Sequence, residues 1–293
     1  MGDSYFFDLF YIRRWITLEI ERIINNNIVT SHQNGNEVVI MGRGIGFKRE
    51  VGAEIDQKSV EKIFSLDTPT NTDQFTSLLQ NIPLEEIQAI NEIVSYAKLS
   101  LGKRLSDSIY VSLTDHIHFA IARHEKGMDF ANALSWEVKH FYHHEYLIGK
   151  EALEILDRKL GVQLPIDEAT TIALHIVNAE MDNTMDHTVG MTKIIKQILS
   201  IIQYSFNTEF SETSLSYERM LTHLKFFVQR ITMNRPLPND NIELFSLIRH
   251  SYPREYECAL KINSYVLEEI GYKLTTAELA YITIHIHRVV NNI

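Results

Sequence analysis

The spacing of apolar and polar residues changes along the chain at about residue 74. Before it, apolar and polar positions alternate over residues 19–24, and β-branched residues fill residues 28–30 and 37–41. Such runs are typical of strands. Asn34-Gly35 separates the last two runs, and both residues tolerate the positive φ that a two-residue hairpin turn requires. The pattern therefore predicts a small antiparallel sheet.

The rest of the chain is predicted to be helical. Residues 58–64 suit one short helix that completes the sheet domain. Further on, Pro83 and the acidic Glu85 and Glu86 stand where the N-terminus of a helix tolerates them. Apolar residues then recur at helical spacing. Helical segments are predicted to begin at Ile82 and to continue over residues 106–123, 135–141, 148–160 and 169–179, with a second series from about residue 192 to 293.

A repeated octad organises the helical part. His116–Arg123 and His223–Arg230 share one frame: a His, an aliphatic residue one position on, Phe three on, an aliphatic residue five on and Arg seven on. The two copies stand 107 residues apart (223 − 116). This period is too long for one unit of a solenoid, so each copy is interpreted as a whole domain.

Each octad is followed by a matching series. An acid, Glu168 or Glu278, precedes a second His, His175 or His285, by seven residues. A Tyr-x-x-Glu-Tyr motif begins 33 residues before that His in both copies (175 − 142 and 285 − 252). A shared register over this length indicates an internal duplication.

The predicted fold class is therefore multidomain: a small antiparallel β domain followed by two tandem all-α helical bundles. A sheet this small buries little core, which favours a homodimer. The expected divisions are an N-terminal extension over residues 1–18, the β domain over 19–73, and the two bundles over 74–187 and 188–293.

Composition limits the class of protein. The single cysteine, Cys258, excludes an intrachain disulfide framework and fits a reducing cytoplasm. The net charge of -10 argues against broad, non-specific nucleic-acid binding, although a small domain that reads RNA by shape remains compatible with it. Because no long uncharged apolar stretch is present, we expect a soluble protein without membrane insertion.

The four repeated histidines are the candidates for chemistry. A single His in an apolar helical frame is most often a hydrogen-bonded core residue. The alternative is that the imidazole accepts a phosphoryl group, which would add charge to a packed surface and switch an interface. Both interpretations stay open on the pattern alone. Arg123 and Arg230, two helical turns after the first His of each copy, are either ordinary ion-paired residues or phosphate ligands.

Metal binding and enzymatic chemistry find little support. In His116-x-His118 and His285-x-His287 the two rings point to nearly opposite sides of a helix, and no zinc-binding motif accompanies them or His143-His144. No nucleophile elbow, phosphate-binding loop or dinucleotide-binding loop is present. Acids flank Cys258 and would raise the pKa of its thiol. We therefore expect no cofactor, no metal and no enzyme.

Two motif sets resemble one known family. Arg22–Asn27 (RIINNN) and Met41–Phe47 (MGRGIGF) resemble the co-antiterminator RNA-binding domain of the BglG/LicT/SacY transcriptional antiterminators. The resemblance covers residue 19 to the end of the chain. The helical copies look like the paired phosphotransferase-system (PTS) regulation domains of that family at Asp115-His116, Leu174–Ala179, His223–Phe227 and His285–Arg288.

The resemblance implies a sugar-responsive, non-enzymatic regulator. Such proteins bind, as dimers, a hairpin in the nascent leader mRNA and prevent an overlapping terminator from forming. Phosphotransferase components phosphorylate the regulatory histidines. The sugar-specific PTS enzyme II inactivates through the first regulation domain, and the phosphocarrier HPr mostly activates through the second.

Two sets of site residues carry over by motif match. The phosphate acceptors would be His116, His175, His223 and His285. The RNA-contacting residues would be Arg22, Asn27, Gly42, Arg43, Phe47 and Lys48.

Side-chain chemistry agrees with these RNA-binding roles. Arg22 and Lys48 suit phosphate contacts, Asn27 can pair with a base edge, and Arg43 can hydrogen-bond or stack. Phe47 either stacks on an unpaired base or packs in the small core.

The N-terminus departs from the family pattern. Leu18 stands where family members usually start, so residues 1–17 are hypothesised to be upstream sequence before a non-AUG initiator at Leu18. Two rival functions each require a feature that the pattern does not supply. A DNA-binding activator with the same regulation domains needs a helix-turn-helix where the pattern predicts strands, and an all-helical metal enzyme needs a metal site.

Overall fold

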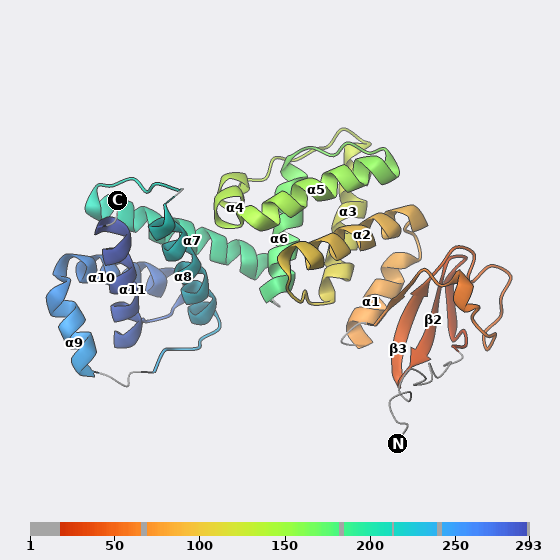
Figure 1. Ribbon diagram of the computed structural model, residues 1–293, viewed down its shortest axis with the longest axis horizontal. Coiled ribbons are helices and arrows are strands. Elements are labelled where there is room, and N and C mark those ends of the chain that lie inside the picture. Colours follow the sequence, from red (N-terminus) through yellow and green to blue (C-terminus); the bar gives the residue numbers. More distant parts are fainter. Residues whose placement is uncertain (1–17, 66–68, 182–184, 213, 239–241, 292–293) are drawn as a thin grey trace, which may run out of the picture. The chain divides into compact units, whose positions relative to one another are not determined.

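The computed structural model describes residues 18–65, 69–181, 185–212, 214–238 and 242–291 (Figure 1). The hypothesis about residues 1–17 falls outside these ranges. The chain forms two compact units: the first contains the residues up to 96 with 106–128 and 155–163, and the second contains 97–105, 129–154 and 164–293. None of the described helices combines the length and the apolar character needed to cross a bilayer.

The first unit begins with the predicted antiparallel sheet. Its strands follow one another in the order β1-β2-β3-β4. At the tip of the β2–β3 hairpin, Asn34 has φ 55° and Gly35 has φ 85°, which confirms the turn expected from this pair. The strands are β1 (Arg22–Asn25), β2 (Ile28–Gln33), β3 (Asn36–Met41) and β4 (Lys62–Phe64).

The predicted short helix over residues 58–64 is wrong. Only Gln57–Ser59 forms a 3₁₀ turn, whose first residue follows an Asp56 cap, and Lys62–Phe64 forms the edge strand β4 against β3. Pairing with a distant strand overrides the local preference here. The pairing buries the apolar side chain of Phe64, which is 3% exposed.

Three aromatic rings join the sheet to the first helices of the unit. The Phe64 ring lies edge-on to Phe75 at 5.2 Å and to Tyr110 at 5.0 Å between centroids. The Asn25 side-chain amide also donates to the carbonyl of Leu79 at 2.8 Å. Phe75 and Leu79 lie in α1 (Pro69–Leu79) and Tyr110 lies in α3 (Ser108–His124), while α2 (Leu84–Leu101) stands between these two helices in the chain. Burial against the sheet thus fixes α1, which begins at Pro69, before the change of pattern at about residue 74 and before the first helix start expected at Ile82.

The second unit has one continuous apolar core. It includes Val138 and Phe141 from the first repeat copy as well as the helices of the second copy, and α7 packs against α6, α8 and α10. The expected all-α organisation is confirmed (Figure 1). The helices are α4 (Ser135–Phe141), α5 (His143–Leu160), α6 (Asp167–Met181), α7 (Met185–Phe206), α8 (Leu215–Thr232), α9 (Ile242–Ser251), α10 (Pro253–Ile270) and α11 (Thr276–Asn291).

A glycine sets the closest approach of α5 and α6. A Cβ atom added to Gly149 would lie 2.2 Å from the carbonyl oxygen of Ala169. By contrast, a Cβ added to Gly190 in α7 would meet no atom within 4 Å. The two helical glycines therefore offer a matched test of backbone contact.

Gly149→Ala is expected to destabilise the second unit by about 1–3 kcal/mol, because overpacking forces the two helices apart. Gly190→Ala should leave stability unchanged or raise it by up to about 1 kcal/mol, since alanine is the better helix former. Urea unfolding followed by circular dichroism measures both. Equal stability of the two variants would contradict the close α5–α6 contact.

Candidate functional site

The Asn turn and the Gly-rich loop of the sheet domain form one structure. The backbone N–H of Gly42 donates to the carbonyl of Asn27 at 2.9 Å, and that of Gly46 donates to the carbonyl of Asn26 at 3.0 Å. The side-chain oxygen of Asn27 accepts from the N–H of Gly44 at 2.8 Å. Because this partner is a backbone donor, the Asn27 oxygen is used within the protein and its NH₂ group is the end that remains for a ligand.

Two glycines of this loop are required because the protein's own backbone leaves no room for a side chain. A Cβ on Gly42 would fall 1.8 Å from the carbonyl oxygen of Ser59, and a Cβ on Gly46 would fall 2.5 Å from that of Asn25. Gly44 has φ +70°, which other residues rarely adopt. The close neighbour of Gly42 is therefore the protein's own chain.

The loop presents basic and aromatic side chains at the surface. The Arg43 side chain is 77% exposed, with its guanidinium 3.9 Å from the Glu85 carboxylate. Phe47 is 54% exposed, so it does not belong to the core of the sheet, and the Lys48 ammonium lies 5.3 Å from the centre of its ring. Arg22 lies on the neighbouring β1 strand and forms an ion pair with Glu37.

The four candidate histidines lie on four different helices. His116 is in α3 of the first unit, and His175, His223 and His285 are in α6, α8 and α11 of the second. His175 and His285 are each 8% exposed, while His116 and His223 are half-buried. The structure directly brings together the pair His223 and His285.

The histidines two positions after His116 and His285 each lie beside a different carboxylate, as expected for residues on another side of the helix. His118 Nδ1 lies 2.8 Å from the carboxylate of Glu86, and His287 Nδ1 lies 3.0 Å from that of Glu255. Among the described residues, no three His, Cys, Asp or Glu side chains converge in a way that could hold a metal ion.

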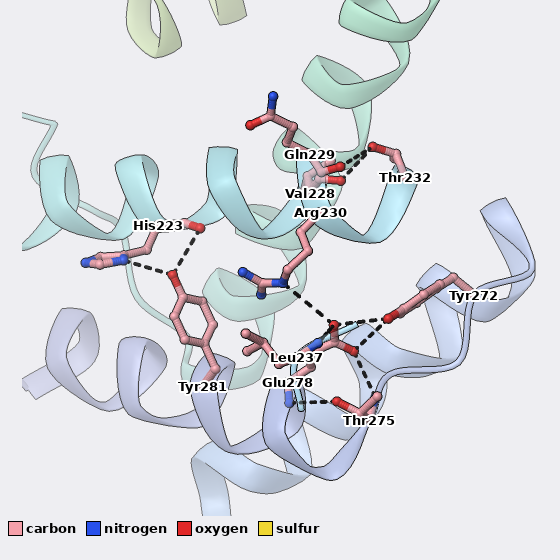
Figure 2. A network of polar contacts seen from close by, with 10 residues as sticks. All are labelled: His223, Val228, Gln229, Arg230, Thr232, Leu237, Tyr272, Thr275, Glu278 and Tyr281. Carbon is pink, nitrogen blue, oxygen red and sulfur yellow. Dashed lines mark hydrogen bonds and ion pairs between the residues drawn. The ribbon is translucent and has the colours of Figure 1, made fainter. Parts of the chain in front are cut away.

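The second copy contains a compact His–Tyr–His arrangement. The rings of His223 and His285 stack with centroids 3.8 Å apart and an interplanar angle of 28°. Nδ1 of His223 lies 2.9 Å from the hydroxyl of Tyr281, which also donates to the backbone carbonyl of His223 at 3.4 Å (Figure 2). Tyr281 is a site residue that the repeat did not reveal, because position 171 of the first copy, 110 residues earlier, is Thr171.

Burial and neighbouring positive charge keep both rings neutral. Burial lowers the pKa of His285 to about 4, and the charges of His223 and Arg288 act in the same direction. The pKa of His223 is also lowered, first by burial and then by Arg288. A neutral imidazole has a lone pair on one nitrogen, which is the form that a phosphoryl acceptor needs.

A buried carboxylate, that of Glu278, fixes the elements around this pair (Figure 2). It is 0% exposed and accepts hydrogen bonds from the Tyr272 hydroxyl at 3.0 and 3.1 Å and from the N–H groups of Leu237 and Thr275 at 3.2 and 2.9 Å. The Glu278 N–H donates to Thr275 Oγ1 at 3.2 Å, which completes a capping box at the start of α11.

Arg230 completes this network from α8. Its Nε lies 3.8 Å from the Glu278 carboxylate, and its guanidinium lies 5.4 Å from the centre of the Tyr281 ring. Of the two roles expected for Arg230, the geometry supports the ion pair. Arg230 also contacts the ring of Tyr281, whose hydroxyl contacts His223.

A second half-buried cation, Lys225, links the two repeat copies within the second unit. The Lys225 ammonium in α8 lies 4.5 Å from the centre of the Tyr142 ring at the end of α4. Burial lowers the pKa of Lys225, and the charges of Glu145 and Glu180 oppose that effect. Cys258 is buried as well, and burial, rather than the flanking acids named by the sequence, is the main cause of the raised pKa of its thiol.

Comparisons with known proteins give a consistent picture. The PRD domain family matches residues 91–179 and 196–289, and the CAT RNA binding domain family matches residues 18–73. The transcription antiterminator LicT of Bacillus subtilis (strain 168) is 48% identical over 274 residues, which cover 93% of this chain and 99% of the relative. The beta-glucoside operon antiterminator of Dickeya chrysanthemi is 43% identical over 273 residues, covering 93% and 96%.

A solved structure is similar over about half of the chain. The crystal structure of GlcT CAT-PRDI is 33% identical to this chain, with a TM-score of 0.50, and the match covers 56% of this chain and 98% of that one.

The burial of His285 predicts a loss of stability in mild acid. In the unfolded chain a His has a pKa near 6.5, whereas His285 in the folded chain has a pKa of about 4. Between these values the unfolded state binds more protons, so stability is full above pH 6.5 and falls as the pH decreases toward 4. His285→Gln should show a shallower fall, measured by urea unfolding at pH 7, 6 and 5.

The matched control is His250→Gln, which alters an exposed His of α9. It should keep the pH dependence of the parent protein. A parent-like slope in His285→Gln would mean that this His does not titrate as its burial requires.

Proposed function

Because the chain belongs to the family of transcription antiterminators that join a CAT RNA-binding domain to PRD regulation domains, we propose that it binds a hairpin in nascent leader mRNA and prevents a terminator from forming. Within this family the chain is a regulator and not an enzyme. The loop that carries Arg43 and Phe47, tied to the Asn turn by three hydrogen bonds, is the observation on which this proposal rests.

The RNA-binding surface is proposed to consist of Arg22, Asn27, Gly42, Arg43, Phe47 and Lys48. The exposed Arg43 and Phe47 can bond and stack with unpaired bases, and Lys48 adds positive charge beside the ring. Gly42 acts by allowing the loop to lie against Ser59. The divisions proposed for the chain are residues 19–73 for RNA binding and 74–187 and 188–293 for regulation.

The protein is proposed to act as a homodimer in the cytoplasm, where nascent transcripts are made. The core of the sheet supports this stoichiometry because it is small; its buried members are Leu18, Ile20, Val29, Val38, Ile40, Ile45 and Ile55. A core of this size gains stability from a partner surface.

Regulation is proposed to proceed by phosphorylation of His116, His175, His223 and His285. A sugar-specific PTS enzyme II would act on the first domain and the phosphocarrier HPr on the second. Support comes from the placement of each His at a helix surface or just beneath it, and from the neutral, stacked pair His223 and His285. A phosphate on such a pair would add charge to a packed interface and disturb it.

Arg43→Ala is expected to weaken binding of a leader hairpin from a β-glucoside operon by about tenfold or more, since one base-directed Arg contact contributes roughly 1–3 kcal/mol. Arg49→Ala, which removes an equally exposed positive charge nearby, should weaken it less than about threefold. Gel shifts at one salt concentration measure both, and the mass of the complex should correspond to two chains. Tighter binding to duplex DNA than to the hairpin would instead favour a DNA-binding activator.

His116→Ala with His175→Ala is expected to give antitermination without inducer, because the inactivating phosphate has no acceptor. A leader–reporter fusion in cells with and without the inducing sugar measures this. The matched double variant, His223→Ala with His285→Ala, should change activity in the opposite direction by removing activation through HPr. Unchanged inducer dependence in the first variant would contradict the proposed inhibition.

A further inference from the structure

We propose that Tyr281 holds His223 as the tautomer with its proton on Nδ1, and so directs phosphoryl transfer to Nε2 of His223. The transfer itself rests on the proposed function, whereas the tautomer does not. Tyr281 is thus a positioning residue for the second regulation domain, and the acceptor is one defined atom.

The hydrogen bonds of Tyr281 assign the proton. A phenol has one proton to donate, and a backbone carbonyl can only accept. We assign the phenol proton of Tyr281 to the His223 carbonyl oxygen, 3.4 Å away, so that the Tyr281 oxygen receives the hydrogen bond from His223 Nδ1 at 2.9 Å. Nδ1 therefore carries the proton of the neutral ring, and the lone pair lies on Nε2. Burial raises the pKa of Tyr281, which keeps the phenol protonated in this role.

The surroundings leave Nε2 as the reactive edge. The second ring nitrogen of His223 points away from Tyr281 (Figure 2). His285 stacks against a face of the ring at 3.8 Å, which blocks that face but not the edge. His223 is half-buried, whereas His285 is 8% exposed. A donor protein therefore reaches His223 more readily than His285.

The transfer step balances without an additional reactant. The Nε2 lone pair attacks the phosphorus of a phosphohistidine carrier protein, and the bond between phosphorus and the donor imidazole breaks with its electron pair left on the donor nitrogen. One proton passes from Nδ1 of His223 through solvent to that donor imidazole. The Tyr281 hydroxyl, which accepted from Nδ1 before transfer, then donates to the bare Nδ1. A carboxylate at position 281 would lack the proton for this second hydrogen bond.

This device belongs to the second copy. The matched position in the first copy is Thr171, whose hydroxyl accepts from the side-chain amide of Asn132 at 3.0 Å. Threonine is also too short to occupy the place of a phenol beside the ring. This position of the first copy therefore supplies no phenol, and the two copies differ at the residue that stands four positions before the second His.

The tautomer is tested without any phosphate. In the full-length protein with ¹⁵N-labelled histidine, the resonances of His223, assigned by their loss in His223→Gln, should show a protonated Nδ1 and an unprotonated Nε2. The opposite pattern would overturn the inference even if the protein is phosphorylated as proposed. Conversely, a correct tautomer with no labelling of His223 would refute the proposed phosphorylation alone.

The transfer is tested with phosphoenolpyruvate, enzyme I and HPr. NMR of the phosphorylated protein should place the phosphoryl group on Nε2 of His223, and a phosphoryl group on Nδ1 would overturn the inference. Tyr281→Phe should mix the two tautomers and slow labelling of His223 by about two- to tenfold, the worth of one hydrogen bond. The control Tyr204→Phe removes a hydroxyl from a tyrosine of α7 that is 89% exposed, so both tautomer and rate should stay as in the parent. Because the tautomer and the phosphorylated nitrogen are both observed in the parent protein, misfolding of Tyr281→Phe leaves the test intact.

Discussion

The buried carboxylate of Glu278 is the interaction on which the arrangement of His223 and His285 depends. It joins the start of α11, the loop before α9 and the end of α8 through hydrogen bonds from Thr275, Leu237 and Tyr272 and an ion pair with Arg230. A buried charge is tolerated only when donors surround it, and the loss of any one donor leaves a costly deficit. The register between α8 and α11 is therefore well determined, and the stacking of His223 on His285 follows from it.

The sheet domain depends on a different constraint, the closeness of two backbone segments. Gly42 and Gly46 lie against the carbonyl oxygens of Ser59 and Asn25, where no Cβ atom fits. The loop gains its shape from these contacts and not from its own side chains. As a result Arg43 and Phe47 are free to face outward, and their orientation is fixed in advance by the backbone, which reduces the entropy lost on binding a ligand.

The hairpin, the later helices and the four histidines were predictable because their signals are local or repeated. The Asn34-Gly35 pair predicts a specific turn type, and the equal spacing in the two copies identifies the repeated histidines. The strand β4 was not predictable, because residues 62–64 become a strand only through pairing with β3. Tyr281 was not predicted as a site residue because the repeat identifies only residues that both copies share. In the first copy the matching residue is Thr171. The exact partners of Glu278 come from segments far apart in the sequence, which periodicity does not connect.

The continuous core of the second unit has a consequence for the order in which the protein matures. The core residues of the sheet all precede residue 65, whereas Val138 and Phe141 are covered by helices that include α7 and α8, which begin more than forty residues further on. Chains leave the ribosome at about 5–20 residues per second, and N-terminal domains generally fold first. The sheet can thus reach its final form while the apolar side chains of the first copy still await their cover. For a protein whose target is itself a growing transcript, the part that holds RNA is completed seconds before the part that governs it.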